Sequence, residues 1–385
     1  MKLARTRPVK TAALALLGAV ALTLTACGPG SVNEDSTTGG GDDTSEDAGN
    51  GGGEELSGSI AGAGASSMEN AQNGWLAGFG DLAPGVTVTY DPTGSGAGRE
   101  QFLNGSVQFA GSDSALDEEE LAAATERCFD GDALELPLYI SPIAIVYNLP
   151  QVSAEHINLP AETIAGIFAG TVTNWNDPEI ADANPDIELP DLAIIPVNRS
   201  DDSGTTENFT EYLTAVAPDV WTHGPVETWP ISGTQSGAQT SGMKSTVEST
   251  EGTIGYIDAS QAGELGTAAI GVGEEFVPFS PEAAAAIVDA SPATEDATDL
   301  RLTVELERDT TEAGTYPIVL ISYTIACSVY DNQADADNVA AYLSYIASTD
   351  GQDRAAEPDV AGSAPISDDL RTRVEAAIDQ ITVSE

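Results

Sequence analysis

One short polar segment, residues 199–205, contains the residue types best suited to bind an anion, and we call it a corner because it joins a predicted strand to a predicted helix. Arg199 follows the apolar run 192–197, and the helix-like segment after it opens with Ser203, Gly204 and Thr205. The first N–H groups of a helix have no intrahelical acceptor and carry partial positive charge, so they suit an oxyanion. The glycine lets a ligand approach the main chain, and the two hydroxyls add donors. The corner predicts an oxyanion site; an ordinary strand-to-helix turn with a surface arginine is the alternative interpretation.

Three further turns rich in Gly, Ser and Asp also follow predicted strands: residues 62–67, 94–98 and 111–113. Their candidate ligand-binding side chains are Ser66, Ser67, Ser95 and Asp113. The chain alternates such strands with helical patterns, which is typical of a parallel, doubly wound α/β sheet. Ligands of these sheets bind outside the carboxyl ends of the strands. The repeated placement of polar turns therefore predicts that the four corners meet at one site.

Composition limits the partners of the chain. The formal net charge is -49, from 13 Lys and Arg against 62 Asp and Glu. So acidic a chain argues against nucleic acid and against an anionic membrane surface as partners. At 385 residues it is long enough for two compact lobes after a leader is removed.

The amino-terminal residues predict export and a tether. Residues 1–26 combine a basic start with a short apolar segment, which is typical of a signal peptide. The segment Leu24-Thr25-Ala26-Cys27 resembles the lipobox of bacterial lipoproteins, which implies cleavage before Cys27 and a lipid on that cysteine. A plain secretory leader is the alternative. Residues 27–55 comprise this cysteine and a stretch rich in Gly, Ser, Thr and acids, which predicts a disordered tether.

The remaining cysteines are Cys128 and Cys327. An even number of cysteines in an exported chain suggests one disulfide, and two buried free thiols are the alternative. The only histidines are His156 and His223, so zinc and haem sites lack ligands. We therefore expect no metal and no cofactor.

The polar turns, taken together and in order, resemble those of the phosphate-binding proteins of the high-affinity phosphate ABC transporter. The matching segments are Gly62-Ala63-Gly64-Ala65-Ser66, Gly94-Ser95-Gly96-Ala97-Gly98, Phe109-Ala110-Gly111-Ser112-Asp113, Thr173-Asn174-Trp175-Asn176-Asp177-Pro178, Arg199-Ser200-Asp201-Asp202-Ser203-Gly204-Thr205 and Gly255-Tyr256. The resemblance extends over most of residues 57–350. The resemblance implies an α/β, two-lobed periplasmic-binding-protein type II fold with two crossing hinge strands.

The resemblance also implies which residues hold phosphate: Ser66, Ser67, Ser95, Asp113, Arg199, Ser203, Gly204 and Thr205. Asp113 would accept a hydrogen bond from a protonated phosphate oxygen, and Asp201 would hold Arg199 in place. An ionised carboxylate only accepts hydrogen bonds, so it favours protonated phosphate over fully deprotonated sulfate. A helix N-cap is the alternative role for Asp113, because a predicted helix begins near residue 116. The family often has a large apolar residue where this chain has Ser67.

Two apolar strand candidates, 139–147 and 316–329, set the expected lobe boundaries. We expect lobe one at 57–140 plus 318–385 and lobe two at 141–317. The resemblance implies a closed, phosphate-loaded form that docks on the membrane permease of an ABC transporter. We expect a monomer, held by its lipid on the extracytoplasmic face of the cell membrane.

Other functions have less support in the sequence. A serine hydrolase of the elbow type would need Gly-x-Ser-x-Gly, which is not present, and nucleotide binding would need a glycine-rich loop before Lys244-Ser245. We therefore expect a binding protein and not an enzyme. The closer alternative is a binding protein for another tetrahedral oxyanion, such as sulfate, molybdate or a phosphonate. Asp113 is the residue that discriminates between these ligands.

Overall fold

The computed structural model describes residues 56–384 of the chain. The predicted signal peptide 1–26, the lipidation of Cys27 and the tether 27–55 lie outside these residues and remain predictions. Within the described range, none of the helices is long and apolar enough to cross a membrane.

Strands and helices alternate through most of the chain. The first elements are β1 (Gly58–Gly64), η1 (Ser66–Met68), α1 (Glu69–Leu82), β2 (Val86–Asp91), α2 (Ser95–Leu103), β3 (Phe109–Ser112), α3 (Glu118–Arg127) and β4 (Ala133–Tyr147). The middle elements are β5 (His156–Leu159), α4 (Ala161–Ala169), α5 (Pro178–Ala181), β6 (Ile195–Arg199), α6 (Gly204–Val216), β7 (Gln235–Gly237), α7 (Gln239–Ser249), β8 (Thr253–Asp258), η2 (Ala259–Gln261), β9 (Gly266–Val272), β10 (Glu275–Val277) and α8 (Pro281–Ala290). The last are β11 (Val319–Cys327), β12 (Val329–Tyr330), α9 (Gln333–Ala347), α10 (Thr349–Ala356), α11 (Asp368–Ile378) and β13 (Thr382–Val383).

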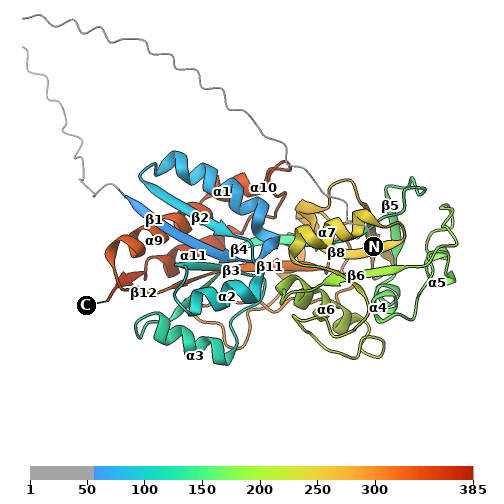
Figure 1. Ribbon diagram of the computed structural model, residues 1–385, viewed down its shortest axis with the longest axis horizontal. Helices are drawn as coiled ribbons and strands as arrows, with labels where there is room; N and C mark the ends of the chain where they lie inside the picture. Colours follow the sequence, from blue (N-terminus) through green and yellow to red (C-terminus); the bar gives the residue numbers. More distant parts are fainter. Residues whose placement is uncertain (1–55, 385) are drawn as a thin grey trace, which may run out of the picture. The chain divides into compact units, whose positions relative to one another are not determined.

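One 11-stranded sheet organises the described residues. Its main path is β2-β1-β3-β11-β4-β8-β6-β7, and β9 joins it by pairing with β4, β5 and β10. We call strands β2, β1 and β3 the β1 side of the sheet, and strands β8, β6 and β7 the β6 side. Pairs within each side are parallel, whereas β11 and β4 pair antiparallel with each other and with their outer neighbours. In Figure 1 these two long strands run from one half of the molecule to the other.

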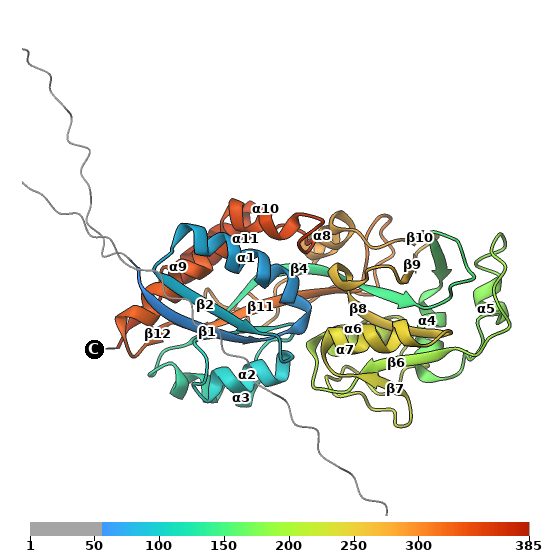
Figure 2. The ribbon, with the colours of Figure 1, turned by 45° about the horizontal axis from the view of Figure 1, so that its top comes forward.

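Helices cover both faces of the β1 side. Figure 2 shows α1, α9, α10 and α11 on one face and α2 with α3 on the other. The central strand β4 is buried along its whole length, and its sequence is almost continuously apolar, as expected of a strand covered on both faces. The large core side chains Trp75 of α1, Tyr342 of α9 and Phe109 of β3 pack in the core between the layer that contains α1 and α9 and the sheet.

The strand β4 is longer than the sequence predicts. The expected strand began at Tyr139, but β4 begins at Ala133 and contains Pro137. This proline lies where the register with β11 shifts: Ser322 is opposite Tyr139, whereas the next residue of β11 is opposite Pro137. Leu138 is therefore an extra residue in β4, a β-bulge, and bulges are among the few places where a sheet accepts proline.

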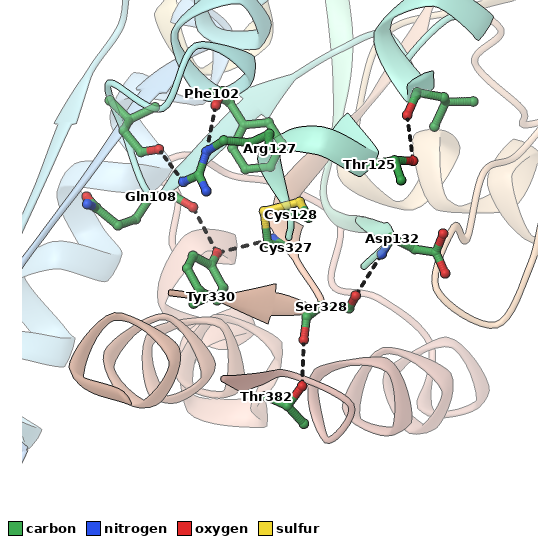
Figure 3. Close-up of a disulfide and its surroundings, with 12 residues drawn as sticks. Phe102, Gln108, Thr125, Arg127, Cys128, Asp132, Cys327, Ser328, Tyr330 and Thr382 are labelled. Carbon is green, nitrogen blue, oxygen red and sulfur yellow. Dashed lines mark hydrogen bonds between the residues drawn. A yellow bond between two sulfur atoms is a disulfide. The ribbon is translucent and has the colours of Figure 1, made fainter. Parts of the chain in front are cut away.

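Cys128 and Cys327 form the predicted disulfide, so the alternative of two free thiols is wrong. Their Cα atoms are 5.1 Å apart although 199 positions separate them in sequence. The bond joins the end of α3 to the end of β11 (Figure 3). Beside it, Tyr330 of β12 donates to the carbonyl of Gln108, the residue before β3, at 2.8 Å.

Candidate anion-binding site

Asp113 lies at the centre of a buried cluster of hydrogen bonds. The residue follows β3 and is 4% exposed. Three hydroxyls donate to its carboxylate: Ser67 Oγ at 2.8 Å from Oδ1 and 2.9 Å from Oδ2, Thr205 Oγ1 at 2.9 Å from Oδ2, and Ser322 Oγ at 2.6 Å from Oδ1. The alternative that Asp113 caps the next helix is wrong, because the N-cap of α3 is Asp117, which forms a capping box.

Arg199 ends β6 and turns its guanidinium inward. Its side chain is 2% exposed, so the alternative of a surface arginine is wrong. Asp201 holds it with two bonds, 2.9 Å from Nε and 2.5 Å from the nearer terminal nitrogen. The same carboxylate accepts the N–H of Gln239 at the start of α7. A guanidinium has five N–H donors, so this pairing fixes the plane of Arg199 and leaves three donors for other acceptors.

The start of α6 approaches Asp113 closely because its first residue is glycine. A Cβ on Gly204 would lie 2.7 Å from Asp113 Cβ and 2.9 Å from Ser95 Oγ, too close for any side chain. Ser203 is the N-cap of this helix and accepts the N–H of Thr206, which leaves its own hydroxyl proton free to donate. The N–H groups of the first turn of α6 are thus brought to the β1 side of the sheet.

The predicted donors of the β1 side lie in the same place. Ser95, the first residue of α2, accepts the N–H of Asp113 at 3.1 Å. Gly94 before it has φ of 103°, a conformation that favours glycine, and this turns the start of α2 toward the cluster. Ser66 Oγ lies 3.0 Å from Thr240 Oγ1 on α7. The starts of η1, α2, α6 and α7 therefore converge around Asp113 and Arg199.

Comparison with known proteins decides the family. Residues 44–350 match the PBP superfamily domain. The chain is 35% identical over 375 residues to phosphate-binding protein PstS3 of Mycobacterium bovis (strain BCG / Pasteur 1173P2), with 96% of this chain and 98% of the relative covered. It is 36% identical over 377 residues to phosphate-binding protein PstS 2 of Mycobacterium tuberculosis (strain ATCC 25618 / H37Rv), with the same coverage. The chain belongs to the PstS family.

Solved structures agree on the fold of this PstS-family chain. A high affinity periplasmic phosphate-binding protein (PfluDING) bound with phosphate superposes with a TM-score of 0.66 at 21% identity, covering 83% of this chain and 93% of that one. The phosphate binding protein of Stenotrophomonas maltophilia gives 0.62 at 20% identity, covering 83% and 94%. The predicted two-lobed type II fold is confirmed. At these identities the likeness concerns the fold alone.

Three residues of the site were not predicted from the PstS-type motifs: Gln239, Thr240 and Ser322. The first two open α7 just after Ser236-Gly237, a fifth Gly/Ser pair, which ends the short strand β7. Its composition was a usable signal, because it repeats the pattern of the other turns. Ser322 gave no such signal, since it lies inside the apolar strand β11 and only tertiary pairing brings it to Asp113.

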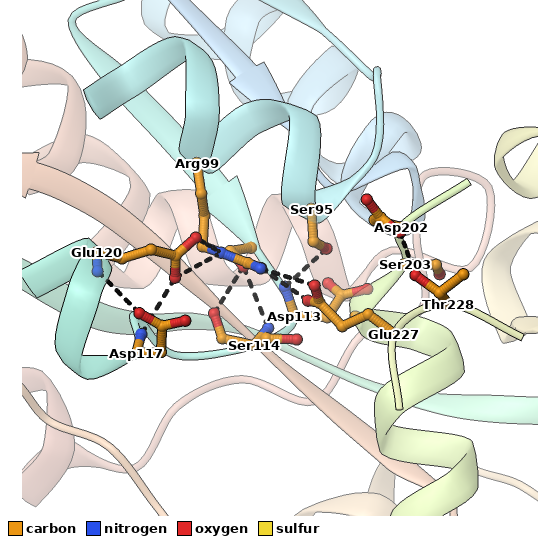
Figure 4. Close-up of polar contacts among 12 residues, drawn as sticks. Ser95, Arg99, Asp113, Ser114, Asp117, Glu120, Asp202, Ser203, Glu227 and Thr228 are labelled. Atoms are coloured by element: carbon orange, nitrogen blue, oxygen red, sulfur yellow. Dashed lines mark hydrogen bonds and ion pairs between the residues drawn. The ribbon is translucent and has the colours of Figure 1, made fainter. Parts of the chain in front are cut away.

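An ion pair joins the two sides of the sheet next to the site. Arg99 of α2 makes two 2.8 Å bonds with Glu227, in the loop after α6, and a 2.8 Å bond with Glu120 of α3 (Figure 4). The Glu227 carbonyl also accepts the Ser203 N–H at 3.3 Å. The loop after α6 therefore bonds both to Ser203, at the start of α6, and to Arg99 on the β1 side.

Burial sets the protonation behaviour of the site. It raises the pKa of the Asp113 carboxyl, and the hydroxyl bonds from Ser322, Ser67 and Thr205 and the charge of Arg199 oppose that rise. A buried carboxylate is costly to ionise unless its lone pairs are satisfied. The three hydroxyls therefore favour the ionised form of Asp113.

A cleft of about 460 Å³ lies beside Asp113 and Ser114. Its walls include three acids, Glu207, Glu211 and Glu305, against one cation, Arg308, which is already paired with Glu211 at 2.7 Å. These acids disfavour an anion, whereas the N–H groups at the helix starts and the free donors of Arg199 can bind one through hydrogen bonds. We therefore locate the candidate anion site at the convergent helix starts and not in the acidic cleft.

Proposed function

We propose that this chain binds inorganic phosphate outside the cytoplasmic membrane and delivers it to an ABC-type permease for import. One observation carries the proposal: the buried acceptor Asp113 and the buried donor Arg199 lie where four helix starts converge. The names of the PstS relatives support phosphate as the ligand.

The hydrogen-bond count at Asp113 favours a protonated tetrahedral anion. An ionised carboxylate has four acceptor positions, and each hydroxyl supplies one proton. Ser67 is nearly equidistant from the two carboxylate oxygens, so its single proton serves one of them. With the hydroxyls of Thr205 and Ser322, three hydroxyl protons are available for the four acceptor positions of the Asp113 carboxylate. The fourth position suits the P–OH of phosphate and opposes sulfate, which carries no proton at neutral pH.

The proposed phosphate ligands are those predicted from the sequence: Ser66, Ser67, Ser95, Asp113, Arg199, Ser203, Gly204 and Thr205. The hydroxyls of Ser67 and Thr205 are directed at Asp113, so their share in binding falls to main-chain N–H groups. Asp201 supports the site by fixing the plane of Arg199. Charge-assisted bonds of this kind stabilise by about 1.5–3 kcal/mol each, so a handful suffices for tight binding.

The proposed lobes are 57–140 plus 318–385 and 141–317, joined through β4 and β11. Because the proposed phosphate-binding residues come from both sides of the sheet, bound phosphate favours the arrangement in which the two lobes are closed. We further propose that the protein works as a monomer, anchored through lipidated Cys27 to the extracytoplasmic face of the membrane, and that its closed form docks on permease subunits.

We propose binding rather than catalysis because neither histidine accompanies the site. His156 Nδ1 lies 2.9 Å from Thr267 Oγ1 beside β9, and His223 packs on Trp221. The remaining alternative is binding of another tetrahedral oxyanion, and the acceptor position on Asp113 argues against ligands without a proton.

Calorimetric titration of the mature chain with phosphate and with sulfate at neutral pH tests the proposal. We expect phosphate to bind at least a hundredfold more tightly than sulfate, from the cost of an unpaired buried carboxylate. Equal affinities would remove the phosphate assignment. Arg199→Ala should abolish tight binding while the melting curve stays cooperative; wild-type affinity in that variant would remove Arg199 from the site.

A further inference from the structure

Ser322 occupies an unusual place for a polar side chain. It lies within β11, where every residue is buried, and is itself 0% exposed. Its Oγ is 2.6 Å from Asp113 Oδ1, the shortest of the three hydroxyl contacts to that carboxylate. A serine buried in an apolar strand is tolerated when its hydroxyl is satisfied, and here the acceptor is the carboxylate that the proposed function makes selective.

The local backbone explains how Ser322 reaches this acceptor. β11 pairs antiparallel with β3, with Tyr323 opposite Ser112, the residue before Asp113. On its other edge, β11 meets the bulge of β4 at Leu138, immediately beside Ser322. The contact therefore depends on two long-range strand pairings and not on a flexible loop.

We propose that Ser322 is a positioning residue for phosphate selectivity: its hydroxyl takes up one acceptor position of Asp113 Oδ1, keeps that carboxylate ionised and leaves a single position for the ligand proton. The proposal rests on the proposed phosphate function and adds a residue to it. Ser322 does not itself contact phosphate; it acts through Asp113.

Other titratable groups around Asp113 do not replace this hydroxyl. Arg199 of β6 favours the ionised carboxylate through its charge, and Tyr90 of β2 donates its hydroxyl to the Ala65 carbonyl at 3.0 Å. Burial raises the pKa of Asp113, and the Ser322 bond is the largest of the effects that oppose the rise. Loss of that bond should therefore raise this pKa further.

The test compares Ser322→Ala with Thr324→Val as a matched control. Thr324 lies two residues along β11, is 0% exposed, and its hydroxyl has no hydrogen-bond partner within the described residues. Both variants remove one buried hydroxyl from the same strand, but only the first removes it from Asp113. Phosphate and sulfate affinities are measured by calorimetry from about pH 5 to pH 9, with thermal melts of each variant.

We expect Ser322→Ala to weaken phosphate binding about tenfold and to lower the phosphate-to-sulfate affinity ratio, because a charge-assisted bond to the selective carboxylate is lost. The pH range over which phosphate binding is lost on acidification, which we call the acid limb, should lie about one pH unit higher in this variant than in wild type. Phosphate titrates identically in every sample, so this difference belongs to the protein. Thr324→Val should keep the wild-type affinity and acid limb.

A Ser322→Ala protein with wild-type phosphate affinity and an unmoved acid limb would overturn the role of Ser322 and leave phosphate binding intact. Equal losses in both variants would also overturn it, because the effect would then be one of strand packing. If Ser322→Ala does not fold, Ser322→Thr decides: it keeps the hydroxyl, and a shifted acid limb there contradicts the proposal. Failure of the wild-type protein to prefer phosphate over sulfate would instead overturn the proposed function.

Discussion

The ion pair between Arg99 and Glu227 gives a test of closure that leaves the ligand contacts untouched. Two bonds of 2.8 Å join α2 on the β1 side to the loop after α6, and the side chains are 7% and 21% exposed. We predict that Glu227→Gln favours the open arrangement of the lobes, because the substitution removes the negative charge from a partly buried pair. The Glu227 backbone bond to Ser203 remains in this variant.

The expected size follows from the geometry. A hydrogen bond to a charged group contributes about 1.5–3 kcal/mol, but Arg99 keeps its bond to Glu120 and Glu227 is one-fifth exposed. We therefore expect a net loss of about 2 kcal/mol in the closed state. If the closed state is the binding-competent one, this corresponds to a Kd raised about 30-fold, mostly through faster phosphate release. The phosphate-to-sulfate ratio should not change, because both ligands require closure.

Stopped-flow release and calorimetry measure this effect, with Glu120→Gln as the control. Glu120 also bonds to Arg99, but it comes from α3 on the same side of the sheet, and glutamine at this position still completes the capping box. We expect that control to bind within about twofold of wild type. The reasoning is refuted if Glu227→Gln also binds within twofold, or if the two variants lose affinity equally.

Three further predictions concern selectivity and stability. Asp113→Asn replaces an acceptor by a group that also donates, so sulfate affinity should rise and the phosphate-to-sulfate ratio should fall at least tenfold by calorimetry; an unchanged ratio would contradict the acceptor role. Burial raises the pKa of Asp258 to about 7, so the folded state keeps a proton that the unfolded state loses. The free energy of unfolding should therefore fall by about 3 kcal/mol between about pH 4 and pH 7, and Asp258→Asn should flatten the profile in denaturant titrations; an equally steep profile in the variant would be contrary evidence. Replacing Cys128 and Cys327 by serine should cost about 2–5 kcal/mol of stability and leave phosphate affinity near wild type, and a variant as stable as wild type would show that the crosslink is not needed.

Local chemistry explains why much of the site was predictable from the sequence. The turns at Gly94 and Ser203 combine the residues that start helices with the residues that hold anions, so composition marks both at once. In such cases the deciding interactions lie within a few residues of one another.

Tertiary pairing decides the parts that were not predictable. Pro137 looks like the end of a strand, but the register shift against β11 accommodates it and β4 continues. Ser322 looks like an incidental polar residue in an apolar run, and its contact with Asp113 exists only because β11 lies between β3 and β4. No pattern within either strand contains that information. The lipidated Cys27 and the lobe boundaries remain predictions.

The charges of the site explain why donors and acceptors, more than net charge, must decide its ligand. The Arg199 cation is already paired with Asp201, and Asp113 adds a further negative charge. In a chain of net charge -49 this leaves no positive excess at the site to attract anions in general. Binding must then come from the N–H groups of the helix starts and the free donors of Arg199, which any tetrahedral oxyanion can use. In the proposed site, only the acceptor position on Asp113 distinguishes a protonated ion from an unprotonated one, and so the hydroxyls that hold Asp113 are predicted to control the selectivity of the whole site.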